Sequence, residues 1–169
     1  KTNKELRKKT RDFDFKKDEL FKLKDELIDA MWLESGLGIS ANQLGHEVRV
    51  FVMRGETKAE SLLCVNPKIE DFSENMNTME EGCLSIPDVF ERVVRPAEIV
   101  VSYYNEMGEE EKQSLDGLTS RVFQHELDHL DGILFIDRIG AFSRIRAFEK
   151  SRKIQKMRKR GKEKYRARF

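Results

Sequence analysis

The sequence predicts an α+β fold in which mixed, mostly antiparallel β-sheets surround a central helix, with one helix near the N-terminus and another at the C-terminus. Three observations support this prediction. Apolar residues recur at helical spacing in two segments, near residues 25 and 125. The chain between them contains several short runs typical of strands. The last 29 residues are strongly basic, with one apolar edge at helical spacing.

The first helix is expected over residues 18–34, where apolar side chains share one face: Leu20, Leu23, Leu27, Ile28 and Met31. It is expected to end near Gly36. The following stretch, GLGISANQLG, is too rich in Gly and small polar residues to continue a helix, and it predicts a loop.

The middle of the chain is expected to be mostly β. HEVRVFVM alternates Val48, Val50 and Val52 as a strand does. Further strands are expected over residues 62–65, 68–72 and 98–104, and NEMGEE after the last of them predicts a hairpin turn.

The central helix is expected over residues 117–130 and should stop at Gly132. Four of its residues fall at i, i+4, i+7 and i+11: Leu118, Val122, His125 and His129. Residues at these spacings share one face, so both histidines are predicted to point toward the core.

A basic helix is predicted at the end of the chain, where Ala141, Ile145 and Phe148 form one apolar edge. Residues 141–169 hold 13 Lys or Arg and two Glu, a formal charge of +11, whereas the preceding residues hold 19 basic and 29 acidic side chains, a charge of −10. The chain is therefore bipolar, although its net charge is only +1. A length of 169 residues suits one domain, with residues 1–140 as its main part and residues 141–169 as its basic C-terminal helix.

Composition also indicates the compartment. Cys64 and Cys83 are too few for a disulfide framework, which favours a reducing environment. No apolar run approaches the ~20 residues of a membrane span, and the basic start lacks the apolar core of a signal peptide. The expected location is the cytoplasm, with no membrane association. Because the chain opens on Lys1, some N-terminal residues are expected to be missing or processed.

QHELDHL contains the pattern His-Glu-x-x-His, typical of helices that bind a catalytic metal. On a helix, His125 and His129 can present ring nitrogens to one ion, while Glu126 reaches a water bound to that ion. The central helix is thus predicted to bind metal. The alternative is a pair of core histidines on an amphipathic helix.

A third ligand is needed, and three routes to it can be compared. The first route, an extended pattern with a third His, is ruled out because that position holds Phe135. Glu149 could serve as in thermolysin-like peptidases, although its basic neighbours favour a surface ion pair. Cys83 in EEGCLSIP would leave the fourth tetrahedral position to water. A closed structural zinc site would instead add Cys64 to Cys83 and both histidines.

Three separated segments together resemble the motifs of one family. GLGISANQ, EGCLS and QHELDH are similar, in order and spacing, to the three motifs of peptide deformylases. The resemblance spans nearly the whole chain, and the CLSIP form and the basic tail are similar to the bacterial type 1 branch.

The resemblance implies a metal hydrolase that removes the N-formyl group from the initiator methionine of nascent chains. It implies one ferrous ion, replaceable by Zn²⁺, Ni²⁺ or Co²⁺, on Cys83, His125 and His129. Glu126 would be the general base, and the amide of Gln43 and the backbone N–H of Leu84 would stabilise the oxyanion. Residues 1–140 would then be the catalytic part of the domain.

The resemblance also implies substrate contacts and partners. Gly38 would pair with the peptide, and four residues would line the pocket for the methionine side chain: Leu37, Met79, Leu118 and Val122. Arg121 is expected at the mouth of this pocket. The basic C-terminal helix would bind the ribosome near the tunnel exit. A monomer is expected, in a bacterial-type cytoplasm or an organelle.

Two positions depart from the family pattern. Ser40 replaces the first of two consecutive alanines, a change of one hydroxyl that should be tolerated. Phe90 stands where some members have an Arg that contacts the substrate backbone, and Arg92 is a candidate replacement.

Overall fold

The computed structural model describes the backbone of residues 4–166 and the side chains of residues 4–159. The chain divides into two compact units, Lys1–Asn77 with Val94–Leu134, and Thr78–Val93 with Phe135–Phe169. The division of the chain at residue 140 stays a prediction. No helix within the described residues is long and apolar enough to cross a membrane.

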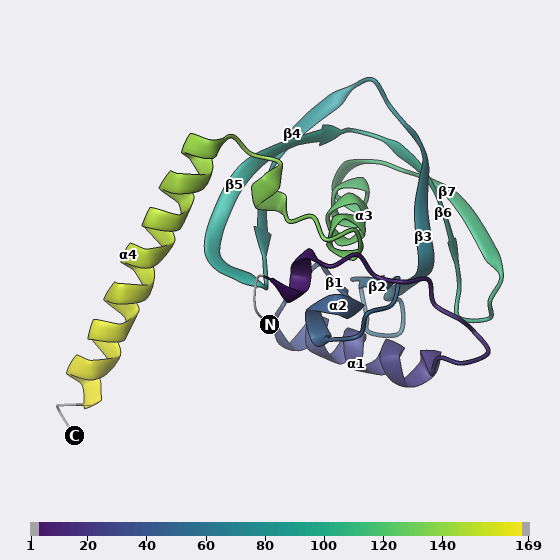
Figure 1. Cartoon of the computed structure of the whole chain (residues 1–169), viewed down its shortest axis with the longest axis horizontal. Coiled ribbons are helices and arrows are strands. Elements are labelled where there is room, and N and C mark those ends of the chain that lie inside the picture. Colours follow the sequence, from purple (N-terminus) through teal and green to yellow (C-terminus); the bar gives the residue numbers. More distant parts are fainter. Residues whose placement is uncertain (1–3, 167–169) are drawn as a thin grey trace. The chain divides into compact units, whose positions relative to one another are not determined.

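Helices and strands are mixed along the chain, which confirms the predicted α+β class (Figure 1). The helical elements are η1 (Glu5–Arg7), α1 (Leu20–Leu33), α2 (Ala41–Leu44), α3 (Gly117–Leu130), η2 (Phe135–Asp137) and α4 (Ala141–Arg166). The strands are β1 (Gly38–Ser40), β2 (Val50–Met53), β3 (Leu62–Phe72), β4 (Met76–Cys83), β5 (Ile86–Pro96), β6 (Ile99–Tyr104) and β7 (Glu110–Leu115). Five strands form a sheet in the order β1-β2-β3-β6-β7 with antiparallel pairing, and β4 pairs with β5.

Helix α1 packs as its periodicity predicts. All five apolar residues of the predicted face are buried, and Leu27 and Met31 are fully so. They belong to one core cluster with residues of β1, β2 and β3, such as Ile39 and Val52. Burying a side chain of this size contributes roughly 1.5–3 kcal/mol, so this face fixes α1 on the sheet.

Residues 62–72 form one strand rather than the two predicted. Asn66 adopts a φ of 49° and Pro67 has no N–H, so the register with β6 shifts between Val65 and Lys68. Pairing resumes at Lys68, and the interruption is a bulge rather than an end.

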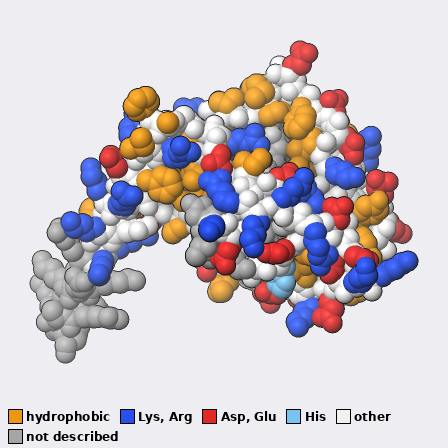
Figure 2. Space-filling view, in the orientation of Figure 1, with side chains coloured by type: hydrophobic (Ala, Val, Ile, Leu, Met, Phe, Trp, Pro, Cys, Tyr) orange, Lys and Arg blue, Asp and Glu red, His pale blue; other side chains and the backbone are white. Residues whose placement is uncertain are grey.

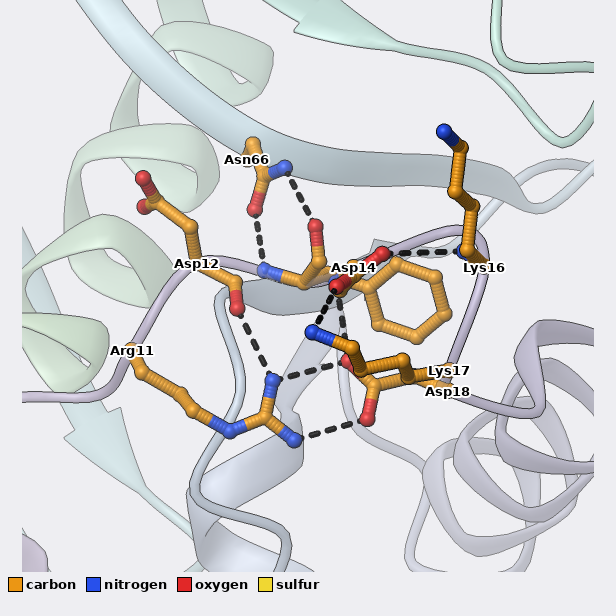
Figure 3. A network of polar contacts seen from close by, with 8 residues as sticks. Arg11, Asp12, Asp14, Lys16, Lys17, Asp18 and Asn66 are labelled. Carbon is orange, nitrogen blue, oxygen red and sulfur yellow. Dashed lines mark hydrogen bonds and ion pairs between the residues drawn. The ribbon is translucent and has the colours of Figure 1, made fainter.

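The N-terminal segment is tied to the sheet by a polar network (Figure 3). The Asn66 side chain accepts from the Phe13 N–H at 2.7 Å and donates to the Phe13 carbonyl at 3.0 Å. Arg11 donates to both carboxylate oxygens of Asp18, at 2.8 and 2.7 Å. The Arg11 guanidinium, with a smaller effect from the Asp14 N–H, lowers the pKa of Asp18 to about 2.

Helix α3 has the predicted bounds and packs against β1 and β2. Its chain reverses at Gly132, whose φ is 75° and whose N–H donates to the His129 carbonyl. A Cβ at this position would lie 2.5 Å from the backbone oxygen of Arg7, so only glycine fits.

The packed face of α4 differs from the predicted one. Ala147 and Ser151 are buried, whereas Ala141 is exposed, Ile145 is 56% exposed and Phe148 is only half-buried. The buried residues Ala147 and Ser151 are small and lie outside the predicted edge. Within the second unit, Ser151 donates to the Pro87 carbonyl at 3.2 Å, a contact that a larger residue would obstruct.

Candidate metal centre and active site

Helix α3 places three candidate residues together. The His125 and His129 rings have centroids 5.0 Å apart at an interplanar angle of 72°. His129 is 1% exposed and Glu126 is 4% exposed, while His125 is half-buried. The predicted spacing therefore gives two neighbouring imidazoles, and a carboxylate one residue away from the first.

Cys83 ends β4 and supplies the third candidate ligand. Cys83, His125 and His129 each offer a ligand atom, and these atoms lie within 4.8 Å of one another. A thiolate with two imidazoles is a donor set that suits zinc, iron, nickel or cobalt. Three protein ligands would leave a fourth position for water, as a catalytic site requires.

The two rival ligands do not join this group within the described part of the chain. Cys64 is fully buried among apolar neighbours on β3, and this burial raises the pKa of its thiol well above the usual value. Glu149 is exposed on α4.

Strand β1 lies directly against Glu126. The Ser40 hydroxyl is 2.5 Å from Oε2 of Glu126. A Cβ at Gly38 would lie 2.8 Å from both Cγ and Oε1 of Glu126, and 2.9 Å from Cγ1 of Val122. The resemblance predicted that Gly38 pairs with the substrate peptide. The packing of β1 against α3 is by itself enough to exclude a side chain at this position.

Helix α2 orients Gln43 and supports α3. The Ser40 N–H donates to Oε1 of Gln43 at 2.9 Å, which sets the orientation of the side-chain amide. Asn42 donates from Nδ2 to the His129 carbonyl at 2.6 Å. The motif GLGISANQ, predicted to be a loop, is thus a three-residue strand and a one-turn helix that contact α3.

The candidate pocket residues differ in exposure. Leu37 and Leu118 are 50% and 55% exposed, while Val122 is 9% exposed and Met79 is partly buried. Leu84 is 40% exposed in the turn between β4 and β5. Arg121, expected at the mouth of this pocket, is 5% exposed, and its place relative to the pocket stays a prediction.

The Arg121 guanidinium donates to the Asn77 carbonyl at 2.7 Å. The Asn77 carbonyl is thus one of the acceptors that a buried guanidinium needs for its N–H groups.

One supporting interaction had no signal in the sequence. Arg95 on β5 donates to Asp128 of α3 at 2.6 Å, and the side chains are 3% and 10% exposed. Removing one partner of such a buried pair costs about 3–5 kcal/mol, because the other charge is left buried. The pair fixes the helix residue next to His129, and its 33-residue separation gives no local pattern.

The central helix of this α+β fold presents two histidines and a glutamate, and a cysteine completes the donor set. This arrangement is typical of mononuclear metal proteins with one open position. Comparison with known proteins then identifies the family. The family model described as polypeptide deformylase matches residues 1–144. The chain belongs to this family, which confirms the resemblance seen in the three motifs.

Several relatives are similar over much of the chain. A peptide deformylase of Prochlorococcus marinus (strain AS9601) is 44% identical over 121 residues, 70% of this chain and 60% of the relative. One from Picosynechococcus sp. is 40% identical over 140 residues, 81% of this chain and 75% of the relative. The matched region thus spans only about 60% of the length of the Prochlorococcus relative.

Solved structures share the fold. A peptide deformylase from Legionella pneumophila has a TM-score of 0.84 at 31% identity, over 93% of each chain. A probable peptide deformylase from Synechococcus phage S-SSM7 has a TM-score of 0.75 at 44% identity, over 79% of this chain and 93% of that chain.

Replacing the candidate thiolate should separate the possible ligand sets. Cys83→Ser is expected to lower metal retention by at least ~10-fold, because a charged ligand is lost. Cys64→Ser is the matched control and should retain the wild-type metal content. Elemental analysis after dialysis gives both values. Full occupancy in Cys83→Ser would favour Glu149, and loss in Cys64→Ser would favour the closed zinc site.

Proposed function

We propose that the protein is a metal-dependent hydrolase that removes the N-formyl group from N-formyl-methionyl nascent peptides and releases formate. The main support is the group Cys83, His125 and His129 beside the buried Glu126, in a chain of the polypeptide deformylase family. The deformylase reading is favoured over a thermolysin-like peptidase because Glu149 is exposed and lies outside this group.

We propose Fe²⁺ as the metal held by Cys83, His125 and His129, with Zn²⁺, Ni²⁺ or Co²⁺ as possible replacements, since the donor set suits all four. When bound, the ion would lower the pKa of a coordinated water from ~16 to near ~7.

Glu126 would act as the general base. Its carboxylate would accept a proton from the attacking water and later pass it to the departing amine, so that the products are formate and a free amino terminus. Burial of Glu126 supports this role, because a site from which bulk water is excluded keeps the carboxylate close to the reacting atoms.

Gln43 and Leu84 would stabilise the charge that develops on the formyl oxygen. The Gln43 carbonyl oxygen accepts from the Ser40 N–H, so the opposite end of the amide, Nε2, is oriented as a donor. The second donor would be the backbone N–H of Leu84. Each donor aimed at the oxyanion contributes roughly 3–4 kcal/mol to transition-state stabilisation.

Glu126→Ala tests the reaction directly. Wild-type protein should release formate from a formyl-Met peptide, and Glu126→Ala should retain metal yet lose at least ~10²- to 10⁴-fold in kcat, because the general base is absent. Glu149→Ala is the control and should keep wild-type activity. The measurement is formate release together with elemental analysis. Comparable release by Glu126→Ala would contradict the assignment.

We propose that the methionine side chain binds among Leu37, Met79, Leu118 and Val122, with the peptide backbone along Gly38. The half-exposed Leu37 and Leu118 support this role, because apolar side chains that remain open are available to a ligand.

This pocket predicts substrate preference. A formyl-Met peptide should have a kcat/KM about 10- to 200-fold above that of the matched formyl-Gly peptide, since filling the pocket contributes roughly 1.5–3 kcal/mol. Equal values for the two substrates would show that these residues do not bind the side chain.

We propose that α4 binds the ribosome near the tunnel exit, in a monomeric protein of the cytoplasm or an organelle. All eight Lys and Arg side chains described between residues 141 and 159 are exposed, against one acid, Glu149. Figure 2 shows basic side chains along the helix. Ribosomal RNA offers the phosphates that such a surface would bind.

Removing the tail should weaken ribosome binding selectively. Deleting Lys150–Phe169 is expected to preserve hydrolysis of short formyl peptides and to reduce cosedimentation with ribosomes, with binding by the intact chain falling steeply as salt rises. Because this deletion also removes the Ser151 contact, Lys153→Gln/Lys156→Gln/Lys159→Gln is a second variant that keeps it. Wild-type binding by both variants would mean that the basic charge is a solubility feature.

A further inference from the structure

A buried serine at the end of β1 contacts the proposed general base. Ser40 is 0% exposed, and its Oγ lies 2.5 Å from Oε2 of Glu126 and 3.3 Å from the Glu126 carbonyl oxygen. A serine hydroxyl has one proton to donate. The shorter contact, to the carboxylate, is the stronger acceptor for it.

We propose that the Ser40 hydroxyl is a positioning group that holds the Glu126 carboxylate in its reactive orientation. The inference depends on the proposed function, in which Glu126 handles the proton of the attacking water. Ser40 would not touch the substrate, so it is not itself a catalytic residue.

The surroundings of Glu126 explain why one hydrogen bond matters. Oε2 is held by Ser40, and Oε1 lies on the side of Gly38, at 2.8 Å from where a Cβ would be. Strand β1 therefore restrains the carboxylate by a bond at one oxygen and by a close backbone surface at the other. Loss of the bond would remove the restraint that Ser40 places on the terminal torsion of Glu126.

The same residue also orients the proposed oxyanion donor. The Ser40 N–H donates to Oε1 of Gln43 at 2.9 Å. The Ser40 hydroxyl also accepts from the backbone N–H of Gln43, and the two residues form a capping box at the start of α2. Ser40 thus contacts the proposed base through its side chain, and the residue that carries the proposed donor through both its backbone and its side chain. Replacing the Ser40 side chain therefore removes this cap as well as the bond to Glu126, and a readout on the Glu126 carboxylate itself is needed to separate the two effects.

Ser40→Ala is a suitable test because alanine removes only the hydroxyl and adds no atom to a fully buried position. The matched control is Ser102→Ala. Ser102 is 7% exposed on β6, and its Oγ donates to Oε1 of Glu70 at 2.5 Å, so this variant loses the same kind of bond away from the helix α3 site.

With metal-loaded protein and a formyl-Met peptide, Ser40→Ala should lower kcat by about 10- to 100-fold and leave KM within about 2-fold, because a misplaced base slows the reaction without removing a substrate contact. Metal content should be unchanged. Ser102→Ala should match the wild type in both constants. An unchanged kcat in Ser40→Ala, a higher KM with kcat intact, or an equal fall in Ser102→Ala would overturn the proposal.

A second readout does not need activity. In protein labelled with ¹³C at glutamate carboxyl carbons, the Glu126 resonance is assigned by its loss in Glu126→Gln. At fixed pH this resonance should shift in Ser40→Ala and stay in place in Ser102→Ala. A resonance that does not respond to Ser40→Ala would reject the hydrogen bond itself. If wild-type protein releases no formate, the proposed function is rejected. The hydrogen bond between Ser40 and Glu126 would then be tested by the Glu126 resonance alone.

Discussion

The packing of β1 against α3 at Glu126 is the contact on which the arrangement of the candidate site depends. A carboxylate that is 4% exposed is costly to bury unless donors replace the water it loses. Ser40 supplies one such donor. The absence of a side chain at Gly38 lets β1 approach closely enough for that bond to form. The hydrogen bond from Ser40 to Glu126 thus depends on the close approach of β1 to α3, and it satisfies the carboxylate that this approach buries.

The rest of α3 is held by similar polar contacts distributed along its last turns. Asp128 pairs with Arg95, the His129 carbonyl accepts from Asn42, and Asp131, just beyond the helix, pairs with Arg49 at 2.7 Å. Each contact joins α3 to a different segment, so sliding or rotating the helix would break several at once. Such restraint suits a helix whose histidines and glutamate must keep a fixed geometry toward one ion.

The sequence predicts best those features that a single segment determines. Helix α1 follows from the one-sided spacing of its apolar residues, and the neighbouring imidazoles follow from the spacing of His125 and His129. Cys83 required the resemblance as well, since an isolated cysteine is typical of many cores. Strand β1 and helix α2 are too short for any period to appear. The predicted face of α4 was wrong because burial there depends on small size, and neither Ala147 nor the polar Ser151 stands out in a hydrophobic pattern.

Ser40 shows a different limit of sequence reasoning. In the sequence, Ser40 is only a small residue with a hydroxyl group. Its effect depends entirely on a partner 86 residues away. Buried polar side chains have large effects of either sign, because an unsatisfied hydroxyl destabilises whereas a satisfied one orients its partner. Here the hydroxyl and the carboxylate satisfy each other. The same substitution facing only apolar neighbours would be a defect, so the contact rather than the residue type determines its meaning.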